Sequence, residues 1–239
     1  HVFVEKPLAM SEKELNEIEI FYSNCEDSNK DYLPLLLTGF NRRFSPIMTQ
    51  IKEIVKNRKL PLVMNYQMNA GYLSPDHWLR TEEGGGRNIG EACHIYDLFT
   101  FLTDSEVTDI KASSIIHVTS DDHAENENFT AMLSFSDGSV GSLTYTSLGI
   151  SKYPKEILNI YMDKNVLVMT DYNKLESHGL SKKNIQFNKV EKGHYEEIKA
   201  FADVLISGGE WPIPLWQQVQ ATRIALEVEK QIASGVTSP

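Results

Sequence analysis

The first forty residues contain two short apolar runs separated by one amphipathic segment. Residues 2–4 read VFV and residues 32–40 read YLPLLLTGF, while the segment between them starts at Ser11 and has Glu14 three residues later. A serine followed three residues on by an acid is typical of a helix start, and apolar residues then recur every three or four positions. A continuous apolar run is typical of a strand covered on both faces, as in a parallel sheet. The pattern therefore predicts strand, helix, strand, which is the end of a doubly wound sheet.

The pattern changes after residue 40. A loop and a helix are predicted in NRRFSPIMTQIKEIVKN, and alternating strands in LPLVMNYQMN, EVTDIKASSIIHV, NENFTAMLSFSDGSVGSLTYTSL and KEILNIYMDKNVLVMTD. SDGS and MDKN are typical hairpin turns, so we expect these strands to be antiparallel. Further helices are predicted over roughly 90–102, 195–206 and 215–232, and SHGLSKKNIQFNKVEKG is predicted to be a loop.

A phosphate-binding glycine motif is missing from the sequence. A doubly wound nucleotide domain carries GxGxxG after its first strand, but this sequence has no GxGxxG, and its glycine-rich stretch GGGRNIG follows the polar stretch LRTEE. We therefore expect residues 1–40 to be the C-terminal remnant of an NAD(P)-binding Rossmann domain. Residues 41–239 are expected to form an α/β domain for substrate binding and oligomerisation. The predicted fold class is α/β (α+β): a remnant of a doubly wound sheet, then an open, mainly antiparallel sheet with helices packed on one face.

Composition narrows the possible partners. The formal net charge of -10 argues against nucleic acid and anionic membrane surfaces, which require clustered Lys and Arg. The two cysteines, Cys25 and Cys93, belong to no CxxC or HxxC pair, so neither a disulfide framework nor a metal site is expected. No apolar run has the length of a membrane span. We expect a soluble protein of the reducing cytoplasm that binds a small molecule.

Several motifs together resemble the Gfo/Idh/MocA oxidoreductases, the glucose-fructose oxidoreductase and inositol dehydrogenase family. They are EKPLA at 5–9, GFNRRFSP at 39–46 and GGGRNIGEACHIYDL at 84–98, with further matches in NAGYLSPDHW, NENFTAMLSFSDGSVGSLTYTS, YPKEILNIYMD and KGHYEEIKAF. The resemblance covers nearly the whole chain, and the order and spacing of the motifs agree. It implies a Rossmann domain for NAD or NADP followed by an α/β domain that supplies substrate contacts.

The resemblance also implies roles for individual residues. Lys6 and His94 would lie beside the nicotinamide and the reacting carbinol, and cofactor contacts would come from Glu5, Lys6, Pro7 and Asn41. Oxidising an alcohol requires a base of near-neutral pKa and a cation that stabilises the developing alkoxide. His94 suits the first role and Lys6 the second.

The predicted helix that carries His94 also carries two carboxylates, and it departs from the family pattern at one position. Glu91, His94 and Asp97 are three residues apart and share one helix face, so a carboxylate could orient the imidazole. The helix start would also lower the pKa of the imidazole. The family pattern has an Asp four residues before the His, where this chain has Gly90, and Glu91 is the candidate to replace it as the third catalytic residue.

Candidate substrate-binding residues are Arg43, His77, Trp78 and Lys155. Each has a structural alternative: a buried ion pair for the arginine, loop packing for the next two, and a solvated charge for the lysine. Four other histidines, His194 among them, show no grouping with other chemical groups.

The function predicted from these observations is NAD(P)-dependent oxidation of a secondary hydroxyl on a sugar, cyclitol or nucleotide-sugar, with this chain inactive by itself. Two alternatives stay open: a non-catalytic sugar- or nucleotide-sensing regulatory protein of the same fold, and a structural assembly module. A homodimer or homotetramer formed through the open sheet is expected, because an apolar sheet face needs cover.

Overall fold

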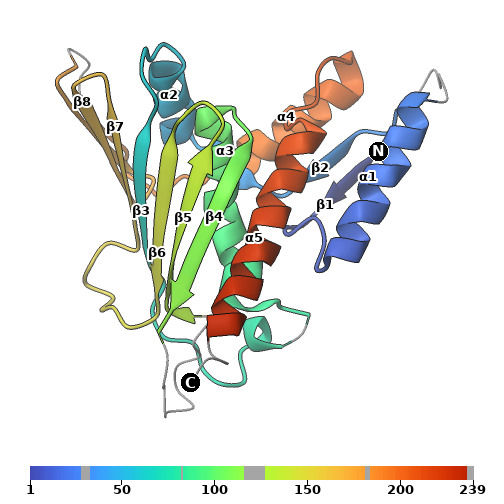
Figure 1. Ribbon diagram of the computed structural model, residues 1–239. Coiled ribbons are helices and arrows are strands. Elements are labelled where there is room, and N and C mark those ends of the chain that lie inside the picture. The colour runs from blue at the N-terminus through green and yellow to red at the C-terminus, as the bar shows by residue number, and fades with distance from the viewer. Residues whose placement is uncertain (28–32, 82, 116–126, 181–183, 236–239) are drawn as a thin grey trace.

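The computed structural model describes residues 1–27, 33–81, 83–115, 127–180 and 184–235 (Figure 1). It contains a two-stranded parallel sheet followed by an eight-stranded sheet with helices, which confirms the predicted fold class. The boundary between domains at residue 40 stays a prediction.

The small sheet is built from the two apolar runs of the first forty residues. Strand β1 (Val2–Val4) pairs in parallel with β2 (Leu36–Thr38), and helix α1 (Glu12–Asp27) connects them. After β2 the chain forms a short 3-10 turn, η1 (Asn41–Phe44), and helix α2 (Pro46–Val55). The carboxyl ends of both strands therefore point to the same edge of the small sheet.

The large sheet has the strand order β10-β9-β8-β7-β3-β6-β5-β4. One pair corrects the sequence-based expectation, because β3 and β6 run parallel, while the other pairings of the described sheet are antiparallel. Strands β9 and β10 fall where no strand was predicted. The strands are β3 (Val63–Asn69), β4 (Val107–Ser114), β5 (Phe129–Phe135), β6 (Val140–Thr146), β7 (Glu156–Met162), β8 (Asn165–Thr170), β9 (Lys174–His178) and β10 (Ile185–Gln186).

Helices cover one face of the large sheet, as Figure 1 shows for α2, α3 and α5. The 3-10 turn η2 (Trp78–Arg80) precedes the π-helical turn η3 (Asn88–Ala92), which leads directly into α3 (Cys93–Thr103). Phe99 of α3 packs so closely on β6 that a Cβ added at Gly141 would lie 2.9 Å from its ring. Helix α4 (His194–Ser207) follows β10, and α5 (Leu215–Gly235) closes the fold.

Helix α5 lies between the two sheets and hydrogen-bonds to both. Gln218 Oε1 accepts from the backbone N–H of Thr38 in β2 at 2.8 Å. Gln231 Oε1 accepts from Ala112 N–H in β4 at 2.8 Å, and so satisfies a donor on an edge strand. Among the described helices, none has the length and apolarity that crossing a membrane requires.

The other face of the large sheet is open. In β5 the side chains of Phe129, Leu133 and their alternating neighbours are buried, whereas Met132 is exposed. Val63, the first residue of β3, is 45% exposed on this face and lies between Val140 of β6 and Tyr161 of β7, both also exposed. The expectation that a second copy covers this face stays a prediction, and this apolar row supports it.

Candidate active site

Lys6 follows β1 directly and reaches the helical segment that carries His94. The ends of β1 and β2 are tied together because the N–H of Gly39 donates to the carbonyl of Val4 at 2.8 Å. The half-buried ammonium of Lys6 donates a hydrogen bond to the carbonyl oxygen of Gly90. Ligands of open α/β sheets bind outside the carboxyl ends of the strands. Lys6 therefore lies where such a ligand would meet η3 and α3.

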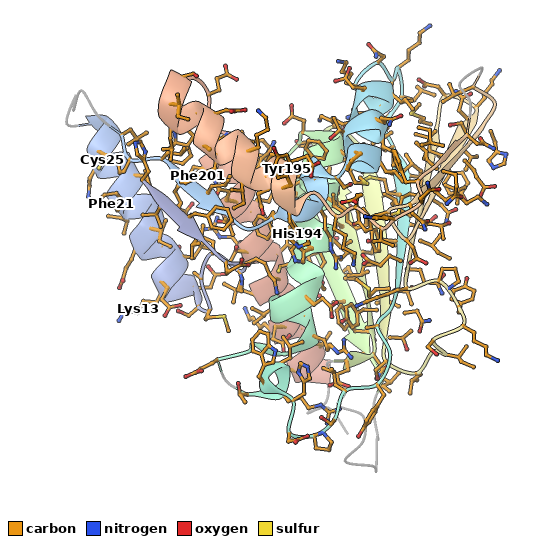
Figure 2. The ribbon with its side chains drawn as sticks, turned by 180° about the vertical axis from the view of Figure 1, so that it is seen from behind. Lys13, Phe21, Cys25, His194, Tyr195 and Phe201 are labelled. Carbon is orange, nitrogen blue, oxygen red and sulfur yellow. The ribbon has the colours of Figure 1, made fainter. Side chains whose placement is uncertain are left out.

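The other residues predicted to bind the cofactor follow the same two strand ends. Glu5 is exposed and Pro7 is half buried. The side-chain amide of Asn41 donates to the carbonyl of Lys192 at 2.8 Å and lies 3.2 Å from Nε2 of His194. Figure 2 labels His194 at the start of α4. No sequence pattern pointed to this histidine, because only the fold brings the start of α4 next to η1.

His94 is buried at the beginning of α3, with only 7% of its surface exposed. Its Nδ1 has no hydrogen-bond partner among the described residues, and the ring lies edge-on to Phe40 at 6.2 Å between centroids. Burial lowers the pKa of His94 well below its usual value, and the positive charges of Arg42, Lys6 and Lys192 lower it further. The imidazole is therefore neutral at physiological pH and can accept a proton.

Gly90 has no room for a side chain. A Cβ added there would lie 2.4 Å from the carbonyl oxygen of Gly84 and 2.9 Å from Cδ2 of Leu79. The π-helical turn packs its backbone directly on the glycine-rich segment, so the Asp of the family pattern would not fit at this position without a backbone shift. Lys6 binds the backbone carbonyl of Gly90 in place of a carboxylate.

Glu91 is bound to one side chain of its own helical turn and to two from the sheet side of the site. Its Oε2 is 3.1 Å from Nη1 of Arg87 and accepts a hydrogen bond from the hydroxyl of Tyr145, and its Oε1 is 3.2 Å from Nζ of Lys155. Burial alone would raise the pKa of Glu91, but Lys155, the Tyr145 hydrogen bond and nearby arginines lower it to about 2. In the described part of the chain its hydrogen bonds and ion pairs go to these groups, and none goes to His94.

Asp97 does not orient the imidazole either. Its carboxylate is fully buried and accepts hydrogen bonds from Nε of Arg43 at 3.0 Å and from Nη2 of the same residue. Arg43 also donates to Oε1 of Gln217 at 2.7 Å, and its guanidinium lies 5.0 Å from the centre of the Phe101 ring. The structure therefore places Arg43, predicted to bind substrate, in a buried ion pair that joins η1, α3 and α5.

A second buried carboxylate lies at the start of β7, and the sequence analysis did not identify it. Glu156 forms ion pairs with Nη1 of Arg42 at 2.8 Å and Nζ of Lys192 at 2.6 Å, and it accepts a hydrogen bond from the Tyr66 hydroxyl. The hydroxyls of Tyr66 and Tyr172 are 3.0 Å apart. Burial would raise the pKa of Glu156, but Arg42 and Lys192 lower it, so the carboxylate is ionised. Arg42 is buried, like its neighbour Arg43.

Two cavities flank this region. The first, of about 450 Å³, is lined by Asn69, Tyr153, Lys155, Glu156 and Lys192, among others. The cavity brings together Lys155, a predicted substrate residue, and Lys192, which lies near the end of the predicted loop at 177–193. One of its lining residues, Lys192, is among the charged groups that influence His94.

The second cavity, of about 710 Å³, lies between the start of α1 and the segment that leads into η3, with Met10, Leu79 and Arg87 among its lining residues. The lining of these two cavities includes neither His77 nor Trp78. Nδ1 of His77 accepts from Leu79 N–H at 3.2 Å, and the His77 ring stacks on that of Trp78, which is exposed. A cluster of three metal-ligating side chains does not occur among the described residues.

Two curated relatives align with most of the chain. The uncharacterized oxidoreductase YrbE of Bacillus subtilis (strain 168) is 22% identical over 245 residues, covering 99% of this chain and 70% of YrbE. The myo-inositol 2-dehydrogenase of Thermotoga maritima is 24% identical over 223 residues, covering 87% of this chain. The chain spans only 63% of that dehydrogenase.

Solved structures share the fold. The UDP-N-acetylglucosamine 3-dehydrogenase GnnA of Acidithiobacillus ferrooxidans gives a TM-score of 0.77 at 16% identity, covering 98% of this chain and 71% of GnnA. A levoglucosan dehydrogenase in complex with NADH and L-sorbose gives a TM-score of 0.75 at 16% identity, covering 99% of this chain and 72% of that enzyme. At these identities the likeness concerns the fold. Residues 48–168 also match the sequence profile of the GFO/IDH/MocA C-terminal domain, and because this match covers about half of the chain, the chain belongs to the GFO/IDH/MocA family.

Proposed function

We propose that the native polypeptide containing this chain is an NAD(P)-dependent dehydrogenase that reversibly oxidises a secondary hydroxyl of a sugar, a cyclitol or a nucleotide-sugar. The observation that carries the proposal is the position of Lys6, whose ammonium binds the carbonyl of Gly90 four residues before the buried, neutral His94. A cation and an unprotonated base are the two groups that alcohol oxidation requires. The activities printed in the names of three relatives, inositol, nucleotide-sugar and levoglucosan dehydrogenases, support the substrate class.

The groups at the strand ends fit a nicotinamide dinucleotide. Glu5 is exposed, and Lys6 uses one of its three N–H donors on a described carbonyl. Nδ1 of His94 has no described partner. These three side chains can therefore form hydrogen bonds with a ligand, Glu5 as an acceptor and Lys6 as a donor. Glu5, Lys6, Pro7 and Asn41 would hold the nicotinamide end. When bound, the cofactor supplies the acceptor for the hydride that leaves the carbinol carbon.

His94 and Lys6 divide the remaining chemistry. A ring nitrogen of His94 takes the hydroxyl proton as the carbonyl forms, and Lys6 hydrogen-bonds the same oxygen and stabilises its negative charge. The low pKa of His94 keeps it unprotonated in the oxidising direction. Glu91 acts at a distance from this pair by holding Lys155, and Arg43 supports η1 from the interior.

The alternative is a protein that binds a sugar and a nucleotide without turnover. Gly90 favours it, because the position has no room for the acid that the family pattern places there. The two functions differ in a single readout: reduction of the nicotinamide.

Measuring NAD+ and NADP+ reduction by the native polypeptide against a panel of sugars, inositols and nucleotide-sugars tests the proposal. Lys6→Ala and His94→Ala are each expected to lower kcat/KM by about 100-fold or more. Lys13→Ala is the matched control for Lys6, because Lys13 is exposed on α1 (Figure 2) with a side chain 87% accessible. Ligand binding with no reduction of either cofactor would establish the non-catalytic alternative, and an unchanged rate in both variants would contradict the roles of Lys6 and His94.

A further inference from the structure

Two ion-pair clusters of the same composition lie beside the 450 Å³ cavity. In the first, Glu91 is 3.1 Å from Arg87 through one oxygen and 3.2 Å from Lys155 through the other. The arginine side chain is 4% exposed and the lysine side chain 45%. The arginine is therefore the buried counter-ion of the carboxylate, and the lysine is the accessible charge.

The second cluster has the same arrangement around Glu156, the first residue of β7. Glu156 is 2.8 Å from Arg42 through one oxygen and 2.6 Å from Lys192 through the other. The arginine side chain is 5% exposed and the lysine side chain 27%. Again one carboxylate serves two cations, so each cluster carries one positive charge in excess.

Lys155 and Lys192 both line the cavity. A further acid in the lining, Asp171, accepts a hydrogen bond from the backbone N–H of Glu156 at 2.8 Å through its Oδ1. The two clusters and Asp171 together hold four cations and three carboxylates, of which Lys155, Lys192, Glu156 and Asp171 line the cavity itself, on a chain whose net charge is -10. The local excess is positive, and the accessible part of it belongs to the two lysines.

We propose that this cavity binds an anionic substituent of the substrate, a carboxylate or a phosphate, between Lys155 and Lys192. This inference rests on the proposed function, since it names the class of sugar derivative that the site takes. An ammonium group binds such oxygens as a compact point charge with three donors. Because each arginine already neutralises its carboxylate, the lysines can turn to a ligand without leaving a buried acid uncompensated.

Calorimetric binding of glucose, glucuronate and glucose 6-phosphate to the native polypeptide, with NAD+ or NADP+ present, tests the proposal. At least one anion is expected to bind about tenfold more tightly than glucose, because hydrogen bonds to charged groups are the stronger ones. Which anion gains more tells whether a carboxylate or a phosphate is the natural group. The preference is expected to shrink as ionic strength rises, since both lysines are accessible to salt.

Lys155→Gln and Lys192→Gln are each expected to weaken anion binding about tenfold and to weaken anion binding more than glucose binding. Lys174→Gln is the matched control, because Lys174 is 44% exposed and ion-paired to Glu176 at 2.9 Å but does not line the cavity. Thermal unfolding of each variant verifies that it is folded, and the salt dependence of the wild type gives a second readout that needs no variant.

Equal affinity for glucose and both anions, no measurable binding of either anion, or unchanged anion binding in both lysine variants would overturn the inference. These outcomes are separate from the test of the proposed function. A protein that binds anions through the lysines without turnover fails as a dehydrogenase and keeps the anion site. A protein that turns over only neutral sugars is a dehydrogenase, and its anion site is refuted.

Discussion

Replacing Glu197 by Gln is expected to stabilise the protein in a way that depends on pH. Glu197 lies in the first turn of α4, is 3% exposed, and its Oε1 has no hydrogen-bond partner among the described residues. Burial raises the pKa of this carboxyl to about 8, with the negative charges of Glu5 and Asp97 adding to the rise and Arg43 opposing it. At neutral pH the folded protein therefore holds Glu197 mainly in its protonated form.

The size of the effect follows from the two pKa values. A rise from 4.5 to about 8, at about 1.4 kcal/mol for each pKa unit, sets an upper bound near 5 kcal/mol. Relaxation and water penetration reduce such bounds, so we expect about 2 kcal/mol. The folded state binds a proton that the unfolded state has already released between these pH values. The stabilising contribution is thus complete below about pH 4.5 and is lost as pH rises through about 8.

Urea unfolding at about pH 5, 7 and 9 measures this difference. Glu197→Gln should match the wild type at the lowest pH and be more stable by about 2 kcal/mol at the highest, because Gln has no proton to lose. Glu196→Gln, which changes the neighbouring half-exposed acid, is the control and should show no such trend. A stability difference that is the same at all three pH values, or one of opposite sign at high pH, would contradict a raised pKa of Glu197 in the folded protein.

Three further changes probe other parts of the molecule. Gly90→Ala should lower the free energy of unfolding by about 1–3 kcal/mol, because the new Cβ meets the Gly84 carbonyl at 2.4 Å. An unchanged urea midpoint would show that the backbone of the π-helical turn shifts to fit the methyl group with no loss of stability. Asp97→Asn should cost about 3–5 kcal/mol, since it leaves the buried Arg43 uncompensated, and a loss below about 1 kcal/mol in the same assay would contradict that ion pair. Val63→Glu should dissociate the expected dimer into monomers in sedimentation velocity, and a wild-type protein that is already monomeric at high concentration would contradict dimerisation through the open face.

Much of the fold was predictable because local patterns and motif order agree. The capped amphipathic segment after Ser11 forms α1, and the apolar run before Gly39 forms β2. The alternation around Leu133 places that side chain in the core and Met132 outside. Periodicity reports which side of an element is buried, and in these segments tertiary packing follows it.

The site was predictable only in part, because sequence spacing does not reveal which partners a charged group meets. Shared helix spacing suggested that Glu91 and Asp97 would serve His94, but Asp97 pairs with Arg43 of η1, and Glu91 pairs with Arg87 one turn earlier and with Lys155 from the segment before β7. The contact of Asn41 with His194 depends on how α4 docks on η1, which no local pattern encodes. Buried charges select partners by geometry across the fold.

The parallel pairing of β3 with β6 has a consequence for synthesis and folding. Val63 of β3 is flanked by Val140 on one side and Tyr161 on the other, so both neighbours of this strand lie far downstream in the chain. Closing loops over such distances costs conformational entropy before the stabilising strand contacts form, and this slows formation of the sheet. On the ribosome, β3 has neither neighbour available until β6 and then β7 have emerged. A chain interrupted before β6 would therefore present this strand with both edges open, in the state most ready to pair with another molecule.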